Sequence, residues 1–130
     1  MPELSSYDYA VVRVVPRVDR EEFLNVGLIL FARTRRALLA RVDLDEGRLA
    51  ALAPGEDPAP IREHLASFVR VAGGGPEAGP VGQLSQSERF HWLTAPRSTV
   101  IQVSAVHSGL CEDPEAELER LFERLVRAAG

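Results

Sequence analysis

The chain has 130 residues, and all fifteen of its positive charges are arginines, because lysine is absent. Nineteen acidic residues give a formal net charge of -4 at pH 7. This balance argues against a general nucleic-acid-binding protein, which normally carries a net basic face. The missing lysine excludes Schiff-base chemistry and the lysine of a phosphate-binding P-loop. With 45% hydrophobic residues, we expect a single folded domain over residues 1–130.

The same sequence predicts a cytoplasmic protein without membrane association. No apolar run approaches the roughly 20 residues that span a bilayer. The segment MPELSSYDY lacks the apolar centre of a signal peptide. The single cysteine, Cys111, cannot form an internal disulfide.

Three strands are predicted in the first third of the chain. Residues 7–16 (YDYAVVRVVP) are rich in valine and tyrosine, and Arg13 interrupts their apolar run. Residues 26–32 and 37–44 form two further apolar segments. The short segment 33–36 between them favours an antiparallel hairpin over a parallel crossover.

Two helices are predicted in the middle of the chain. Asp45 is a suitable N-cap for a short helix through Leu52, and Asp57-Pro58 begins a stronger one. The second helix carries its apolar stripe at Ile61, Leu65, Phe68, Val69 and Ala72. Residues 73–82 hold half of the glycines and predict a flexible loop.

The last third predicts one more strand and one more amphipathic helix. Residues 87–93 fit a short helix or an ordered turn, residues 98–106 a fourth strand, and Asp113-Pro114 a helix start. The helix stripe is Leu118, Leu121, Phe122, Leu125 and Val126, and Glu123 can pair with Arg127. The predicted fold is therefore α+β: a mainly antiparallel sheet of about four strands, two amphipathic helices and short extra helical turns.

Polar residues gather unusually around the predicted fourth strand. Strand periodicity would place Ser98, Gln102 and Ser104 on one face with Val100. If this strand neighbours the first one, that polar face can meet Arg13. A buried arginine needs a partner. The candidates are Glu21, Glu22, Glu88 and a ligand anion, so a structural ion pair and a binding site both remain open.

Other reactive side chains have simpler interpretations. His107 and Cys111 lie four residues apart, but Gly109 separates them, so we expect Cys111 to be a packed residue. His107, at a predicted strand end, is the candidate catalytic group. Phosphate contact by Arg33, Arg35 and Arg36 competes with a solvated hairpin tip, which we favour. No metal-ligand set or cofactor motif is recognised, so we expect neither a metal nor a cofactor.

Three segments, YDYAVVRVVPRVDREEFLNVGLILF, QSERFHWLTAPRSTVIQ and VHSGLCEDPE, carry a family resemblance. The chain closely resembles an uncharacterised bacterial family, domain of unknown function 3037, from about Tyr7 to Val126. The resemblance implies hallmark positions at Tyr9, Arg13, Pro16, Glu22, Asn25, Gly27, Gln86, Arg97, Gln102, His107 and Gly109. It also implies small stand-alone proteins that are often encoded beside a kinase-like protein of the persistence-toxin type.

Two functions from different classes fit these observations. In the first, which we favour, the chain is a non-catalytic binding or accessory module for a protein partner, such as the kinase-like neighbour. Phe90 and Trp92 would anchor that interface, although core packing is the simpler role for both.

In the second, the chain is a small enzyme or a ligand-binding protein for an anionic group: a nucleotide, phosphate or carboxylate. Arg13 and Arg97 would clamp the anion. Gln102 and Asn25 would orient it, and His107 would serve as general acid or base. The glycine-rich segment 73–82 would act as a lid. Nucleic-acid binding is not expected from so acidic a chain.

Overall fold

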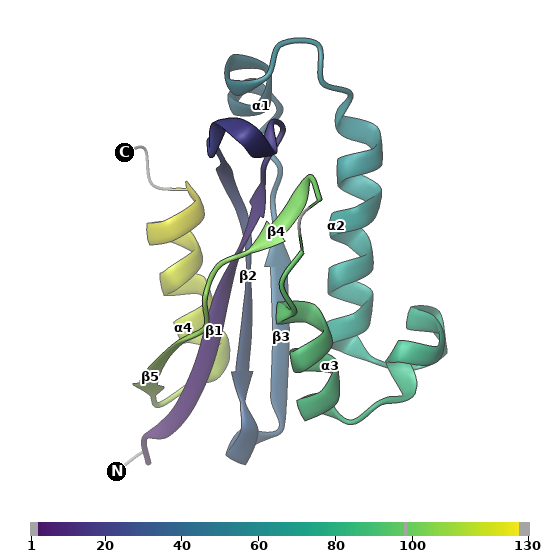
Figure 1. Ribbon diagram of the computed structural model, residues 1–130. Coiled ribbons are helices and arrows are strands. Elements are labelled where there is room, and N and C mark those ends of the chain that lie inside the picture. The colour runs from purple at the N-terminus through teal and green to yellow at the C-terminus, as the bar shows by residue number, and fades with distance from the viewer. Residues whose placement is uncertain (1–2, 98, 128–130) are drawn as a thin grey trace.

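A single antiparallel sheet with helices on both faces organises the chain (Figure 1). The computed structural model describes residues 3–97 and 99–127. The strands are β1 (Ser5–Val14), β2 (Leu24–Ala32), β3 (Ala37–Val42), β4 (Ile101–Val103) and β5 (His107–Cys111). Their order is β3-β2-β1-β4, with β5 also paired to β1. The predicted α+β class and the β2–β3 hairpin are confirmed.

The helices begin where the sequence supplies caps. They are α1 (Glu46–Leu52), α2 (Pro58–Gly73), α3 (Gln86–Thr94) and α4 (Pro114–Phe122), which continues as a π-helical turn, Glu123–Arg127. Shorter 3-10 turns cover Val18–Arg20, Arg33–Arg35 and Pro76–Gln83. Asp45, Asp57 and Asp113 each accept a hydrogen bond from a first-turn N–H, as predicted.

One edge of β1 is shared by two short strands. β1 pairs with β5 from Ser5 to Tyr9 and with β4 from Val12 to Val14. Between them the hydroxyl of Ser104 accepts a hydrogen bond from the Val11 N–H at 2.9 Å. The Ser104 N–H donates to the Val11 oxygen in return, at 2.9 Å. The predicted strand 98–106 is wrong in extent, because β4 covers only Ile101–Val103, and β5 was not anticipated. Ser98 lies outside the described residues.

The sheet separates two apolar clusters. α1, α2 and α3 contribute to the cluster around Val12, Val14, Ile29, Phe68, Leu93 and Ile101. α4 closes the other cluster, around Tyr7, Val11, Leu28, Leu30, Leu121 and Phe122. Because side chains alternate along a strand, Arg13 projects to the α4 face. The helices occupy opposite sides of the sheet in Figure 1.

Two details in and after α2 differ from the sequence predictions. Val69 is 39% exposed, while Val71 is buried instead, because the buried face of α2 is centred on Leu65 and Phe68. The expected flexible loop 73–82 is largely a 3-10 helical turn, Pro76–Gln83. Gly82 is buried in this turn, and its carbonyl accepts a hydrogen bond from the Gly75 N–H. No described helix is long and apolar enough to cross a membrane.

Candidate functional site

A row of three polar side chains crosses the sheet on the α4 face. Arg13 of β1 pairs with Asn25 of β2 on one side and with Gln102 of β4 on the other. The β1–β2 register shifts between Val12 and Arg13. Such a bulge bends the strand and re-aims its side chains. The sequence argument that Arg13 would meet the polar face of the fourth strand is therefore confirmed at Gln102.

The Arg13 side chain borders an open cavity. The cavity has a volume of about 450 Å³ and is lined by Arg13, Val15, Glu21, Phe23 and Gln102. The guanidinium carbon lies 4.2 Å from the centroid of the Phe23 ring. Phe23 itself is 47% exposed. A cation over an exposed aromatic ring leaves the guanidinium edge available for a planar anion.

None of the acidic residues that the sequence offered to Arg13 forms an ion pair with it in the described ranges. Glu21 lines the cavity without pairing. Glu22 pairs with Arg20 at 2.6 Å. Glu88 belongs to the capping box of α3 with Ser85. The Nε of Arg13 is buried and has no hydrogen-bond partner in the described structure.

The two amides beside Arg13 are held by backbone carbonyls. Gln102 donates from Nε2 to the Thr99 oxygen at 3.0 Å, and Asn25 from Nδ2 to the Leu125 oxygen at 3.1 Å. The Asn25 Oδ1 is buried without a partner in the described structure. These bonds fix the orientation of both amides. Gln102 lines the cavity beside Arg13, whereas Asn25 is not among its lining residues.

Arg97 does not join this site. Its guanidinium donates to the carbonyls of Trp92, Leu93 and Ala95, between 2.8 and 3.0 Å away. It also lies over the rings of Phe68 and Trp92, on the α2 and α3 face of the sheet. Burial lowers the pKa of this guanidinium. The proposed clamp of Arg13 and Arg97 is therefore wrong, because the sheet separates the two side chains.

His107 is also away from Arg13. Its imidazole packs against Tyr9, with ring centroids 5.3 Å apart. Tyr9 is its strand partner and lies four residues before Arg13 on β1, which corresponds to about 13 Å along the strand. Among residues 3–97 and 99–127, no contact therefore links His107 to the cavity as an acid or base. Cys111 is buried, and desolvation raises the pKa of its thiol.

Two further groups, Arg89 and Tyr7, form side-chain hydrogen bonds away from the Arg13 cavity. Arg89 is 9% exposed and donates to the Leu84 and Ala72 carbonyls at 2.9 and 3.4 Å. Its Nε is buried without a partner in the described structure, as is the Nε of Arg13. Tyr7 donates its hydroxyl to Glu117, which also accepts from Arg120 at 2.8 and 2.9 Å. The capping pattern at Ser85 was the available signal for the α3 start that positions Arg89.

The Tyr7–Glu117 contact perturbs both groups. The Arg120 hydrogen bonds, followed by the Tyr7 hydroxyl, hold the pKa of Glu117 at about 2, against the effect of burial. Burial and the Glu117 carboxylate raise the pKa of Tyr7 to about 12. Gly109 makes room for this contact, because a Cβ there would lie 2.7 Å from the Tyr7 hydroxyl.

The remaining candidates take structural positions. Phe90 is buried and packs against Phe31, as the simpler interpretation predicted. Trp92 is 40% exposed and covers Arg97. Arg33 donates to Ser87, and Arg35 donates to Ser5 and to the Glu3 carbonyl. Across residues 3–97 and 99–127, no cluster of three or more His, Cys, Asp or Glu could hold a metal ion.

An α+β domain with a row of three polar side chains across one face of its sheet is the class that these observations define. The chain belongs to the family described as protein of unknown function (DUF3037), whose model matches residues 9–126. No curated protein and no solved structure matched the chain. The family match covers Arg13, Asn25 and Gln102, so the cavity lies within the family domain.

Proposed function

We propose that this chain is a non-catalytic binding protein, and that the cavity beside Arg13 receives a carboxylate or phosphate group. The observation that carries the proposal is the guanidinium of Arg13, which faces an open cavity without a carboxylate partner in the described structure. An arginine fork matches the two oxygens of such groups. Phe23 would act as a platform under the guanidinium, and Gln102 as a flanking polar contact.

Glu21 restricts which anion fits. Its carboxylate shares the cavity with Arg13 and Phe23, so a small, highly charged anion would be repelled at short range. A group that combines one anionic end with neutral or cationic surroundings is better matched, because Glu21 can then pair with the rest of the ligand. A side chain or a chain end of a protein has this character.

The partner that we propose to test first is the kinase-like protein of the persistence-toxin type that the family resemblance implies as a neighbour, in the bacterial cytoplasm. A free anion is the other source of the same chemistry. The enzyme alternative would need a proton-transfer group at the cavity. His107, the sequence candidate for that role, packs against Tyr9 instead. The carboxylate that does line the cavity, Glu21, is proposed to pair with the ligand, so we test binding before catalysis.

NMR spectra of the labelled chain would test the proposal, with the Arg13 Nε–H and the Gln102 side-chain amide as reporters. The kinase-like protein, inorganic phosphate and a nucleotide are titrated separately. We expect one of them to shift both reporters, and Arg13→Met to weaken that binding at least about tenfold. Arg62→Met, on the surface of α2, is the matched control. The proposal fails if no titrant shifts the reporters or if both variants bind alike.

A further inference from the structure

The outer edge of β3 is open to another strand. In the described part of the chain, β3 pairs only with β2. The Asp43 N–H donates to the Val26 oxygen at 2.7 Å, so the backbone groups of Asp43 point toward β2. In an antiparallel pair every second residue points its backbone groups the same way. Leu39 and Arg41 therefore turn their backbone groups toward β2, whereas Leu38, Ala40 and Val42 turn theirs outward. Unpaired outward groups on an edge strand are a template for a further strand.

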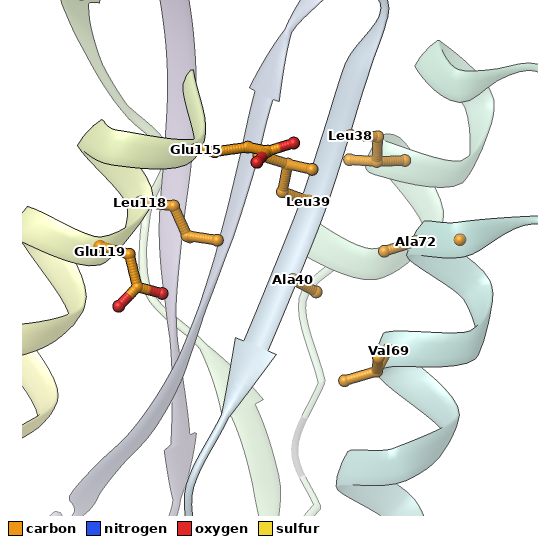
Figure 2. Close-up of a pocket in the computed structure, with 9 residues that line it drawn as sticks. Leu38, Leu39, Ala40, Val69, Ala72, Glu115, Leu118 and Glu119 are labelled. Atoms are coloured by element: carbon orange, nitrogen blue, oxygen red, sulfur yellow. The ribbon is translucent and has the colours of Figure 1, made fainter. Parts of the chain in front are cut away.

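A groove follows this edge between α2 and α4. Its main part has a volume of about 390 Å³ and is lined by Leu38, Leu39, Ala40, Val69, Ala72, Gly73, Glu115, Leu118 and Glu119. Figure 2 shows the α4 side chains on one side of β3 and the α2 side chains on the other. A second cavity of about 200 Å³ beside Val42 and Ala66 continues it along α2. Exposed Val69 lies within the groove.

We propose that the occupant of this groove is the β3 strand of a second copy of the chain. The strand would run antiparallel about a two-fold axis at Ala40. In this register Leu38 lies opposite Val42 of the other chain, and Ala40 lies opposite Ala40 of the other chain. The outward backbone groups of Leu38, Ala40 and Val42 are then all paired. Leu38, Ala40 and Val42 all pack on the α2 side, so apolar side chains meet apolar side chains there.

Charge complementarity on the α4 side supports a second copy. In this register Arg41 of one chain lies opposite Leu39 of the other, and opposite residues project to the same face. Glu115 lines the groove beside Leu39 and forms no ion pair in the described ranges. Arg41 pairs with Glu119 of its own chain. Its guanidinium has five N–H donors and can bind the second chain's Glu115 as well.

Symmetry strengthens the argument for self-association over a separate peptide. Each chain supplies both the arginine and the glutamate, so the charge contact forms twice across the axis. α2 packs against β3. A second copy would therefore bring its α2 beside the first and cover both Val69 side chains, which one added strand would leave largely exposed. The surface is distinct from the Arg13 cavity, which lies toward the β4 edge.

Sedimentation equilibrium across micromolar concentrations would test this interface. We expect a mass twice the 14.2 kDa of one chain. Glu115→Arg should weaken the dimer at least about tenfold, because like charges would then face each other. Glu56→Arg makes the same charge change beside Ile101, away from β3, and should not weaken it. Ala40→Pro removes one outward N–H and should give a monomer.

Amide hydrogen exchange gives a second measurement that does not depend on any variant. The amides of Leu38, Ala40 and Val42 should be protected more strongly as the protein concentration rises, while those of β4 should not. A chain that stays monomeric throughout overturns the proposal. A dimer that both Glu115→Arg and Ala40→Pro leave intact, with unchanged exchange at β3, overturns this interface equally.

Discussion

The arginines on the two faces of the sheet have different partners. On the α2 and α3 face, Arg89 and Arg97 donate to carbonyls at or beside helix ends, Ala72 of α2 and Leu93 of α3 among them. The last carbonyls of a helix have no partner within it, and a cation near them is stabilising. These hydrogen bonds give both side chains structural roles, although the buried Nε of Arg89 has no partner in the described structure.

On the α4 face, Arg13 has no helix end to satisfy. It lies within β1, where the backbone groups of its neighbours are used by β2 and β4. Its guanidinium contacts the ring of Phe23 and an open cavity instead. Burial alone therefore does not make an arginine a candidate ligand-binding residue. A guanidinium that donates to carbonyls of the fold has a structural role, whereas one that faces a cavity can bind a ligand.

The largest effect that this comparison predicts is for Arg89→Met. The variant should lower the free energy of unfolding by about 3 kcal/mol, because two carbonyls lose their donor in a buried site. Urea denaturation would measure it. Arg70→Met, an exposed position on α2, should change stability by at most about 0.5 kcal/mol. Equal losses in the two variants would refute a structural role for Arg89.

Sequence patterns predicted the parts of the fold that depend on local chemistry. Aspartate before proline marked the starts of α2 and α4, and the short link 33–36 marked the hairpin. These features need only the spacing of neighbouring residues. The meeting of Arg13 with the polar strand was predicted only on the condition that the two strands are neighbours, and the pairing of β1 with β4 meets that condition.

The side of the sheet that each polar residue occupies could not be predicted in the same way. The argument from alternation assumed an unbroken strand over 98–106, but β4 covers only Ile101–Val103, and the successive residues Val100 and Ile101 both pack against the α2 cluster. Arg97 follows the end of α3, so its position depends on where that helix packs. Such placement is set by tertiary contacts that no short window of sequence contains.

A smaller effect is predicted at the other end of the α4 face, where Tyr7 binds Glu117. The depressed pKa of Glu117, about 2, means that the unfolded chain takes up its proton first. The stabilisation is present above the ordinary carboxyl pKa of about 4.3 and is lost as the pH falls from there toward 2. Tyr7→Phe should cost about 1–2 kcal/mol at neutral pH.

The same variant should flatten both ends of the pH profile. The pKa of Tyr7 is raised to about 12, so the wild-type chain should lose stability as the pH rises from about 10 toward 12. Tyr7→Phe should remove this alkaline loss and reduce the acid one, because Arg120 still holds Glu117. Urea titrations at several pH values would show it. A profile identical to that of the wild type would contradict the Tyr7–Glu117 contact.

The smallest effect on stability is predicted at Arg13. Arg13→Met should change the free energy of unfolding by less than about 1 kcal/mol, because the variant keeps apolar contact with Phe23 and, unlike Arg89→Met, takes no hydrogen bond from a carbonyl of the described structure. The contrast with Arg89→Met is the sharpest available, since the substitution is the same on opposite faces of one sheet. A loss at Arg13 as large as that at Arg89 would mean that its guanidinium is structural. That result would contradict the proposal that the cavity is a binding site.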